Sequence, residues 1–281
     1  IEAGRGSDAL TGGGDADVFI FARGDGKDVI RDFSGAAGEG DVLRLQIPGL
    51  ASFDALIALA IGQGGDLRLD FGRGDRIILA GLDSNDLTPG DIVFEGGTGA
   101  DRLTGGANGD QIAGNRGNDL LRGGAGNDTL SGEEGNDQIF GEAGSDTLLG
   151  GDGSDSLSGD SGDDLLAGGT GNDTLRGGDG NDRLAGGTGT DAMTGNAGAD
   201  TFIFASGDGN DSITDFMFGS GAPEDADLII LSVAGIMAFA DLGSRASETA
   251  TGVAFDLGNG DRLFLSGLRL SQISADDFVF I

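Results

Sequence analysis

Twelve aspartates recur every nine residues along the middle of the chain, and they are the residues best able to do chemistry. Each stands at the sixth position of a nine-residue unit that begins with glycine, and the units run without insertion over residues 96–203. The twelve are Asp101, Asp110, Asp119, Asp128, Asp137, Asp146, Asp155, Asp164, Asp173, Asp182, Asp191 and Asp200. Carboxylates together with backbone carbonyls supply the oxygen ligands that hard cations such as Ca²⁺ prefer. The spacing therefore predicts a series of metal ligands rather than one isolated site.

The rest of the composition narrows that chemistry. The chain has no Cys and no His, so the usual zinc ligands and the commonest general base are missing. Its 48 acidic and 16 basic residues give a net charge of −32, which repels the phosphates of nucleic acids and anionic membrane surfaces. No apolar run approaches the roughly 20 residues that span a bilayer. We therefore expect cations as partners, no nucleic-acid binding and no membrane insertion.

The other positions of the nonapeptide predict the elements that hold the aspartates. Glycine fills the first position in all twelve units and the fourth in eleven, with Asn108 as the exception. We expect these glycines, and those at position two, to adopt positive φ and to point carbonyls into the turn. Position eight is always large and apolar, so positions seven to nine predict a short strand whose middle side chain faces inward.

The repeat length predicts how these strands stack. Two units complete one coil of 18 residues, and coils stack at about 4.8 Å, the ordinary strand spacing. One buried Leu per unit contributes about 1.5–3 kcal/mol, whereas ordering nine residues costs about 1–2 kcal/mol each. Because the thin core cannot offset that cost and the stacked carboxylates repel, we expect metal binding and folding to be one event. Without metal, a disordered polar tract is the expected state.

The pattern Gly-Gly-x-Gly-x-Asp-x-apolar-x resembles the RTX, or haemolysin-type calcium-binding, repeats of bacterial secreted proteins. The unit at residues 168–176 matches it at every position. The resemblance implies an all-β fold, a parallel β-roll (a calcium-bound β-solenoid) with flanking capping modules. It also implies about ten Ca²⁺ ions in the array, each shared by aspartates two repeats apart, such as Asp101 and Asp119.

The same resemblance implies the other ligands of each ion. The carbonyls of positions two and four come from one repeat, and those of positions one and three come from the repeat two further on. Examples of the latter are the carbonyls of Gly96, Thr98, Gly105, Ala107, Gly114, Arg116, Gly123, Ala125, Gly168, Thr170, Gly177 and Asp179.

The sequences on either side of the array are copies of each other. Residues 19–33 return as 202–216, and residues 74–82 return as 260–268. The pattern predicts a first β-roll or cap module at 1–94, the twelve repeats at 95–203 and a C-terminal cap module at 204–281. Both flanking modules resemble the C-terminal domain of serralysin-type secreted proteins. A cap is needed because an open solenoid end exposes strand edges.

The flanking modules add further candidate ligands. Asp8 and Asp17 lie in nonapeptide-like turns, and Asp28 and Asp211 occupy matching places in the two copies. Asp32 and Asp215 could ligate as well; the alternative for the acids outside regular repeats is that they are solvated turn residues. Residues 52–61 predict one short amphipathic helix with Ser52 as its N-cap.

These features predict a calcium-binding module that folds outside the cell and supports type I secretion of a larger extracellular protein. The chain starts within a repeat, so we expect it to be a fragment of a longer protein. The ending Asp277–Ile281 resembles a type I export signal, although it also fits a last strand. The partners would be Ca²⁺ and the type I secretion apparatus. The alternative is a structural part of a large bacterial adhesin, biofilm or surface-layer protein, with cell-surface or biofilm partners.

Two other classes of function fit the repeats less well. An ice-binding face would need a regular rank of Thr or Asn, and position three is irregular. An enzyme would need a departure from the repeat that forms a unique pocket, and every carboxylate pair here belongs to a repeat. We therefore expect no catalytic residue within this chain, whereas the parent protein could be a protease, lipase, epimerase or adhesin.

Overall fold

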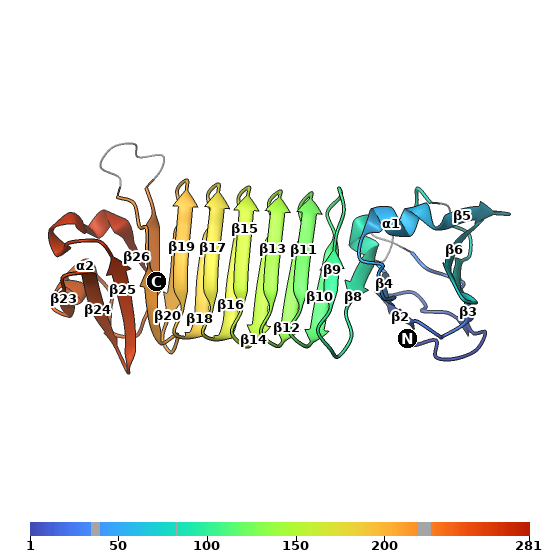
Figure 1. The fold of residues 1–281 in the computed structure, drawn as a ribbon, viewed down its shortest axis with the longest axis horizontal. Helices are drawn as coiled ribbons and strands as arrows, with labels where there is room; N and C mark the ends of the chain where they lie inside the picture. The colour runs from blue at the N-terminus through green and yellow to red at the C-terminus, as the bar shows by residue number, and fades with distance from the viewer. Residues whose placement is uncertain (35–39, 83, 219–225) are drawn as a thin grey trace.

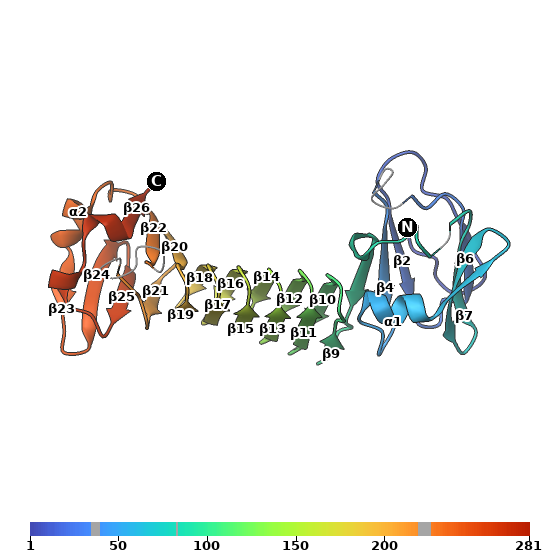
Figure 2. The same ribbon diagram turned by 90° about the horizontal axis from the view of Figure 1, so that it is seen from above.

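The computed structural model is an elongated, nearly all-β molecule whose strands run across its long axis (Figure 1). It describes residues 1–34, 40–82, 84–218 and 226–281. The central strands stack in a straight, thin row, and a thicker lobe stands at each end (Figure 2). Within the described residues, no helix is long and apolar enough to cross a membrane.

Two long sheets form the two faces of the roll. The first contains, in order, β2 (Val18–Ala22), β4 (Val42–Gln46), β8 (Ile92–Glu95), β10 (Gln111–Arg116), β12 (Thr129–Glu134), β14 (Thr147–Asp152), β16 (Leu165–Gly171), β18 (Arg183–Gly189), β20 (Thr201–Ala205), β22 (Leu228–Ser232) and β26 (Phe278–Phe280). The second contains β23 (Ala246–Glu248), β24 (Gly252–Gly258), β25 (Asp261–Ser266), β21 (Asn210–Ile213), β19 (Ala192–Ala197), β17 (Thr174–Asp179), β15 (Ser156–Ser161), β13 (Gln138–Ala143), β11 (Leu120–Ala125) and β9 (Arg102–Thr104).

The register of the central strands confirms the 18-residue coil. Every neighbouring pair in the array is parallel, and Leu130 of β12 lies opposite Ile112 on one side and Leu148 on the other. The strands are longer than the expected triplet, because they continue from position seven through position three of the next unit. In β14, for example, six residues run from Thr147 to Asp152.

The position-eight side chains form the thin core, as expected. Each is at most 5% exposed: Leu103, Ile112, Leu121, Leu130, Ile139, Leu148, Leu157, Leu166, Leu175, Leu184, Met193 and Phe202. Because the two sheets face each other across these single rows of side chains, the core is continuous from one end module to the other.

The end modules thicken the roll with antiparallel strands and short helices. The remaining elements of the first module are β1 (Ala9–Leu10), β3 (Lys27–Ile30), β7 (Asp75–Leu79), β6 (Asp66–Gly72), β5 (Ala60–Gln63), α1 (Phe53–Ala58) and η1 (Pro89–Asp91). Those of the second are α2 (Phe239–Gly243), η2 (Leu270–Gln272) and η3 (Ala275–Asp277). In the first module the antiparallel strands β7, β6 and β5 end a five-stranded sheet of order β1-β3-β7-β6-β5. In the second module the antiparallel strands β23, β24 and β25 form one end of the second long sheet.

The helix predicted over residues 52–61 is right at its start and wrong at its end. The Ser52 hydroxyl accepts the N–H of Ala55 at 3.2 Å and caps α1, which then stops at Ala58. Residues 60–63 instead form β5 against β6. The ladder hydrogen bonds to β6 therefore replace the last helical turn, a tertiary effect that local periodicity does not contain.

Candidate calcium-binding columns

The twelve position-six aspartates lie in two columns, one for alternate repeats. In each column the backbone N–H of an aspartate donates to Oδ1 of the aspartate two repeats later, at 2.6–2.9 Å. The strand register enforces this placement, since the carbonyl of Asp101 also accepts the N–H of Leu120 at 2.9 Å. The array thus contains ten such pairs. Which of these groups ligate a cation stays a prediction.

The second carboxylate oxygen, Oδ2, is left without a partner in most of the columns. Ten array aspartates, among the residues that the structure describes, have a buried Oδ2 with no hydrogen-bond donor: Asp119, Asp128, Asp137, Asp146, Asp155, Asp164, Asp173, Asp182, Asp191 and Asp200. A buried charged oxygen without a partner costs free energy, and native proteins rarely tolerate one. Ten of them in register call for a positively charged partner that the chain itself does not supply.

Carbonyl oxygens point into the same spaces as these Oδ2 atoms. A Cβ built on Gly132 would lie 2.2 Å from Oδ2 of Asp137 and 2.7 Å from the carbonyl oxygen of Gly150. The same pair of oxygens flanks every position-one glycine from Gly114 to Gly177. Carboxylate and carbonyl oxygens together suit a hard cation such as Ca²⁺. No group of three or more acidic, His or Cys side chains gathers among the described residues, so any cation held here would need carbonyl ligands as well.

Position-one glycines are therefore needed for space and not for conformation. The prediction of positive φ is confirmed at positions two and four from the third repeat onward, for example at Gly151 (109°) and Gly153 (141°), but it is wrong at Gly97, Gly99 and Gly106. It is wrong at position one, where none of the twelve glycines, all of them described, has a positive φ. Any side chain there would enter the space between Oδ2 and the carbonyl.

The units without glycine at position two keep the same turn. Their residues are Asn115, Glu133, Glu142, Asp160 and Asn196, and each has a φ between 71° and 74°. Asn and Asp tolerate the left-handed conformation better than most residues, whereas it is unfavourable for the two glutamates. The fold nevertheless imposes it, so the direction of the neighbouring carbonyls is preserved along the array.

Burial raises the pKa of the eleven column aspartates from Asp110 to Asp200 because the charged form loses its hydration. It raises the pKa of Asp128 and Asp182 to about 7, and that of Asp164 and Asp173 to about 6. The N–H of the preceding column aspartate lowers each pKa, and the neighbouring carboxylates raise it again. Without a cation, burial in the folded columns therefore shifts these carboxyls toward the neutral acid.

We expect the calcium-free chain to gain β-structure when the pH falls from about 7.5 to about 5. The pKa of these carboxyls is higher folded than the roughly 3.9 of an unfolded Asp. The folded state therefore binds more protons between about pH 4 and 7, and its stability falls as the pH rises through that window. Circular dichroism in excess chelator measures the effect. An equal β signal at both pH values would count against it.

The first coil of the array departs from the others. Oδ2 of Asp101 accepts the N–H of Gly97 at 2.6 Å, and Oδ2 of Asp110 accepts the N–H of Gly106 at 2.7 Å. Neither glycine has a positive φ. Oδ1 of Asp110 accepts the N–H of Phe53, at the start of α1, at 2.8 Å. In this coil, backbone N–H groups donate to the Oδ2 atoms, whereas the Oδ2 atoms of the later repeats have no donor.

The first module accounts for the single exception at position four. The carboxylate of Asp54 accepts the side-chain N–H of Asn108 at 2.5 Å and the backbone N–H of Ala107 at 3.1 Å. A glycine at position 108 would lack the first of these bonds. Asn108 therefore joins the array to α1, a role that the repeat pattern does not reveal.

Asp28 and Asp211 extend columns into the flanking modules. Oδ1 of Asp28 accepts the N–H of Asp8 at 2.9 Å, and Oδ1 of Asp211 accepts the N–H of Asp191 at 3.0 Å. Oδ2 of Asp28 is buried without a donor, as in the array. Burial raises the pKa of Asp211 to about 7. Both residues stay predicted ligands.

Asp32 and Asp215 hold backbone turns. The two oxygens of Asp32 accept the N–H groups of Gly12 and Gly13 at 3.0 and 2.9 Å. Those of Asp215 accept the matching N–H groups of residues 195 and 196 at 3.0 and 2.8 Å. Because both oxygens already accept strong donors, these carboxylates favour a structural role over ligation.

Two column residues escaped sequence reasoning, Asp41 and Asp227. Oδ1 of Asp41 accepts the N–H of Asp17 at 2.9 Å, and Oδ1 of Asp227 accepts the N–H of Asp200 at 3.0 Å. A signal existed, since each begins an Asp-x-apolar sequence like positions six to eight. Counted back from these aspartates as position six, positions one, two and four hold no glycine. Their Oδ2 atoms accept the N–H groups of Ser34 and Met217.

A second ladder, at position five, was also missed. The side-chain oxygen of Asn118 accepts the N–H of Asn136 at 3.0 Å, and that of Asn136 accepts the N–H of Ser154 at 2.8 Å. Asn, Asp or Ser at this position in most central units was the available signal. The ladder supplies coil-to-coil hydrogen bonds on the turn that do not need a cation.

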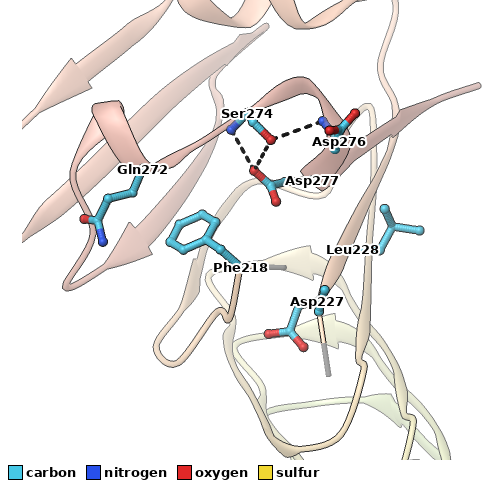
Figure 3. Close-up of a pocket in the computed structure, with 8 residues that line it drawn as sticks. Phe218, Asp227, Leu228, Gln272, Ser274, Asp276 and Asp277 are labelled. Carbon is cyan, nitrogen blue, oxygen red and sulfur yellow. Dashed lines mark hydrogen bonds between the residues drawn. The ribbon is translucent and has the colours of Figure 1, made fainter. Parts of the chain in front are cut away.

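Asp227 also lines a cavity of about 460 Å³ in the second module (Figure 3). The ring of Phe218 and the carboxylate of Asp277 are part of the same lining. Asp277 accepts the backbone N–H and the hydroxyl of Ser274 at 2.7 and 3.0 Å. Both carboxylates thus fix turns of the cap, which favours a structural role for this cavity.

Comparison with known proteins identifies the repeat. The family model of the RTX calcium-binding nonapeptide repeat matches residues 1–30 and, in overlapping copies, residues 93–202. Endo-1,3-1,4-beta-glycanase EglC of Rhizobium meliloti (strain 1021) is 37% identical over 70 residues, which are 25% of this chain and 14% of that protein. The crystal structure of extracellular lipase LipA from Serratia marcescens matches with a TM-score of 0.41 at 20% identity, covering 73% of this chain and 44% of that chain. The chain thus spans less than half of either protein.

Proposed function

We propose, from the premise that this chain belongs to the RTX calcium-binding nonapeptide-repeat proteins, that it is the calcium-dependent folding module of a larger secreted protein. One observation carries the proposal: ten buried Oδ2 atoms without a donor, in two regular columns. Ca²⁺ would supply the missing positive charge. The ligands would be the column aspartates with the carbonyls of the glycine turns.

The same columns explain why folding would wait for export. In a cytosol with scarce free calcium, the net charge of −32 and the unpaired carboxylates oppose the compact state. The chain would stay extended and pass through a secretion channel. Outside the cell, calcium would neutralise the columns, and the folded roll would prevent return.

The number of ions should follow the number of aspartate pairs. We propose about ten ions in the array, with further ions at the Asp8–Asp28 and Asp191–Asp211 pairs. Asp155 belongs to two pairs, as partner of Asp137 and of Asp173. We therefore expect Asp155→Asn to remove up to two ions from the stoichiometry measured by isothermal titration calorimetry.

A matched control is available three residues earlier. Asp152 is exposed, and its carboxylate accepts a hydrogen bond from the Thr170 hydroxyl at 3.0 Å, outside the columns. Asp152→Asn removes the same charge without touching a column, so the stoichiometry should stay unchanged. If both variants lost ions equally, general charge and not the columns would govern calcium binding.

Export can be tested with the whole chain expressed beside a type I secretion apparatus. We expect the full chain in the medium and a chain lacking residues 277–281 to stay in the cells. Because the calcium-poor cytosol leaves both chains unfolded, loss of the β26 strand should not itself affect passage. Equal export of the two chains would remove the signal from the C-terminus.

A structural role in a surface protein is the second candidate, and the duplication favours it. The array lies between two copies of one module, and the first sheet runs through all three parts from β2 to β26. Such a continuous sheet would make a stiff spacer. Fractionating cells of the source organism discriminates: retention at the surface supports the spacer, whereas release into the medium supports a soluble secreted parent.

A further inference from the structure

A second cavity of the second module lies over the strands β21, β25 and β24, which are neighbours in the second long sheet (Figure 2). Its volume is about 420 Å³, within the roughly 300–1,000 Å³ that small-molecule sites occupy. We call it the Phe264 pocket. Its lining includes Asn210, Ser212, Thr251, Ala254, Arg262 and Phe264.

Phe264 forms the apolar centre of this pocket. Ser212 of β21 lies opposite it on one side, and Ala254 of β24 lies opposite it on the other. Both neighbours are small, so the half-buried ring stays accessible between them. A Cβ on Gly252 would lie 2.8 Å from the ring, so only a glycine lets the backbone pack this closely against Phe264. The ring thus offers a flat apolar platform in a fixed place.

Two polar side chains beside the ring have no partner in the protein. Asn210 and Arg262 lie opposite each other on β21 and β25, and both are exposed. Within the part of the chain that the structure describes, neither side chain makes a hydrogen bond or an ion pair. Asp256, opposite Arg262 on β24, instead accepts the N–H of Gly258 at 3.0 Å. The Arg262 guanidinium is therefore available to an anionic ligand.

The turn between β23 and β24 forms a preformed wall of the pocket. The Thr249 hydroxyl accepts the N–H groups of Thr251 and Gly252 at 3.3 and 3.1 Å, and it donates to the Gly252 carbonyl at 2.9 Å. These bonds hold the Thr251 hydroxyl beside the pocket. On the other side, Ser212 donates to the Asp191 carbonyl at 3.3 Å, so the Ser212 oxygen can still accept a hydrogen bond.

The first module fills the matching place with a long side chain. The counterpart of Ala254 is Arg68, whose guanidinium pairs with Asp70, and the counterpart of Phe264 is Ile78. Arg68 lies opposite Ile78, as Ala254 lies opposite Phe264. The opening over the aromatic ring therefore comes from a difference between two copies of one module and not from the fold that they share.

We propose that the Phe264 pocket binds a sugar ring that carries a carboxylate. The apolar face of the sugar would lie on the Phe264 ring, and the Arg262 guanidinium would bind the carboxylate through charge-assisted hydrogen bonds. The side chains of Asn210, Ser212 and Thr251 would bond with the sugar hydroxyls. A hydrocarbon ligand would leave these polar groups without partners, which disfavours it.

One carboxylate of the protein also lines the pocket, that of Asp211. It is 4% exposed, and its Oδ1 accepts the N–H of Asp191 at 3.0 Å. Asp211 therefore belongs to the aspartate column and leaves the positive charge of Arg262 to the ligand.

The test is a titration of the calcium-loaded whole chain with glucuronate, measured by saturation-transfer difference NMR. We expect saturable transfer to the ring protons of the sugar. Glucose lacks the carboxylate and acetate lacks the ring, so each should bind at least about tenfold more weakly, the effect of losing one charged hydrogen bond or the apolar contact. No transfer to glucuronate, or equal affinity for glucose or acetate, would overturn the proposal.

Ala254→Arg is the sharpest variant, because it gives the second module the side chain of the first. Asp256 occupies the place of Asp70, so the new arginine has a partner and the fold should be kept. We expect glucuronate binding to fall at least about tenfold, since the arginine covers the Phe264 ring. Unchanged binding by this variant would show that glucuronate lies elsewhere.

Arg262→Gln tests the carboxylate contact separately. It should weaken glucuronate binding about tenfold and leave the weaker glucose binding as it is. Arg269→Gln is the control, because Arg269 is an exposed arginine of the same module that lies outside the pocket lining. Equal losses from the two variants would reduce the effect to general charge and overturn the proposal. Circular dichroism in calcium, expected to be the same for all variants, separates a lost site from a lost fold.

Discussion

Removing calcium should unfold the twelve-repeat array in one cooperative transition at neutral pH. Each repeat of the array buries one large apolar side chain at position eight. The free energy of that burial cannot offset the entropy lost when nine residues per repeat become ordered. Each bound ion raises the free energy of unfolding by RT ln(1 + c/Kd), where c is the free calcium concentration. This amounts to about 2.7 kcal/mol when calcium is 100-fold above Kd. With ten unpaired Oδ2 atoms to neutralise, the summed effect exceeds the usual 5–15 kcal/mol stability of a domain.

Circular dichroism during a calcium titration measures the transition, and hydrogen exchange locates it. We expect amide protection to be lost first over residues 101–200. Any residual structure should lie in the end modules, whose larger cores include the ring pairs Phe21–Phe71 and Phe255–Phe278, with centroids 5.5 and 5.9 Å apart. Mg²⁺ is the matched control, because it demands a smaller octahedral site and should restore little structure. A complete β signal in excess chelator would refute calcium-coupled folding.

Replacing one position-one glycine by alanine should damage both the fold and calcium binding. A Cβ on Gly150 would lie 2.4 Å from Oδ2 of Asp155 and 2.4 Å from the carbonyl oxygen of Gly168. Backbone in two adjacent coils must then shift, which we expect to lower the calcium-loaded free energy of unfolding by about 2–3 kcal/mol. The calcium midpoint of folding should rise as well, because the displaced oxygens are the proposed ligands.

Gly99→Ala provides the control within the same array. Gly99 stands at position four of the first repeat, has no positive φ and has no atom within 4 Å of the place that an alanine Cβ would take. Alanine there should change stability by at most about 1 kcal/mol, and the change can be a gain because alanine restricts the unfolded chain. Similar losses from Gly150→Ala and Gly99→Ala would show that chain entropy, and not the space between ligands, explains the glycines. Thermal unfolding at fixed calcium measures both.

The nonapeptide pattern predicted the central architecture because twice its period equals the 18-residue offset between paired strands. Two units of nine residues return the chain to the same face, so Leu130 must lie opposite Leu148, and Asp137 must lie near Asp155. Periodicity also located the buried core residues. It did not show that the strands continue through position three, because glycine at positions one and two has no strand preference of its own.

The contacts between the modules and the array were beyond any local pattern. The N–H of Phe53 reaches Asp110, 57 residues along the chain, and Asp54 reaches Asn108. Nothing in the neighbouring sequence of either residue encodes that approach. Asp41 and Asp227 lie in the columns for a similar reason: they accept the N–H groups of aspartates 24 and 27 residues earlier, and the 18-residue coil predicts neither spacing.

The sequence by itself determined the repeat, the 18-residue coil and the inward apolar row, and it predicted oxygen ligands for a hard cation, because each depends on residue type at a fixed spacing. Only the tertiary structure decided which carboxylate oxygens are free and which are already bound. Oδ2 of Asp155 is buried without a donor, whereas Oδ2 of Asp110 accepts an N–H. That difference arises where coils meet a module and a peptide group turns toward the carboxylate, a matter of packing between distant segments.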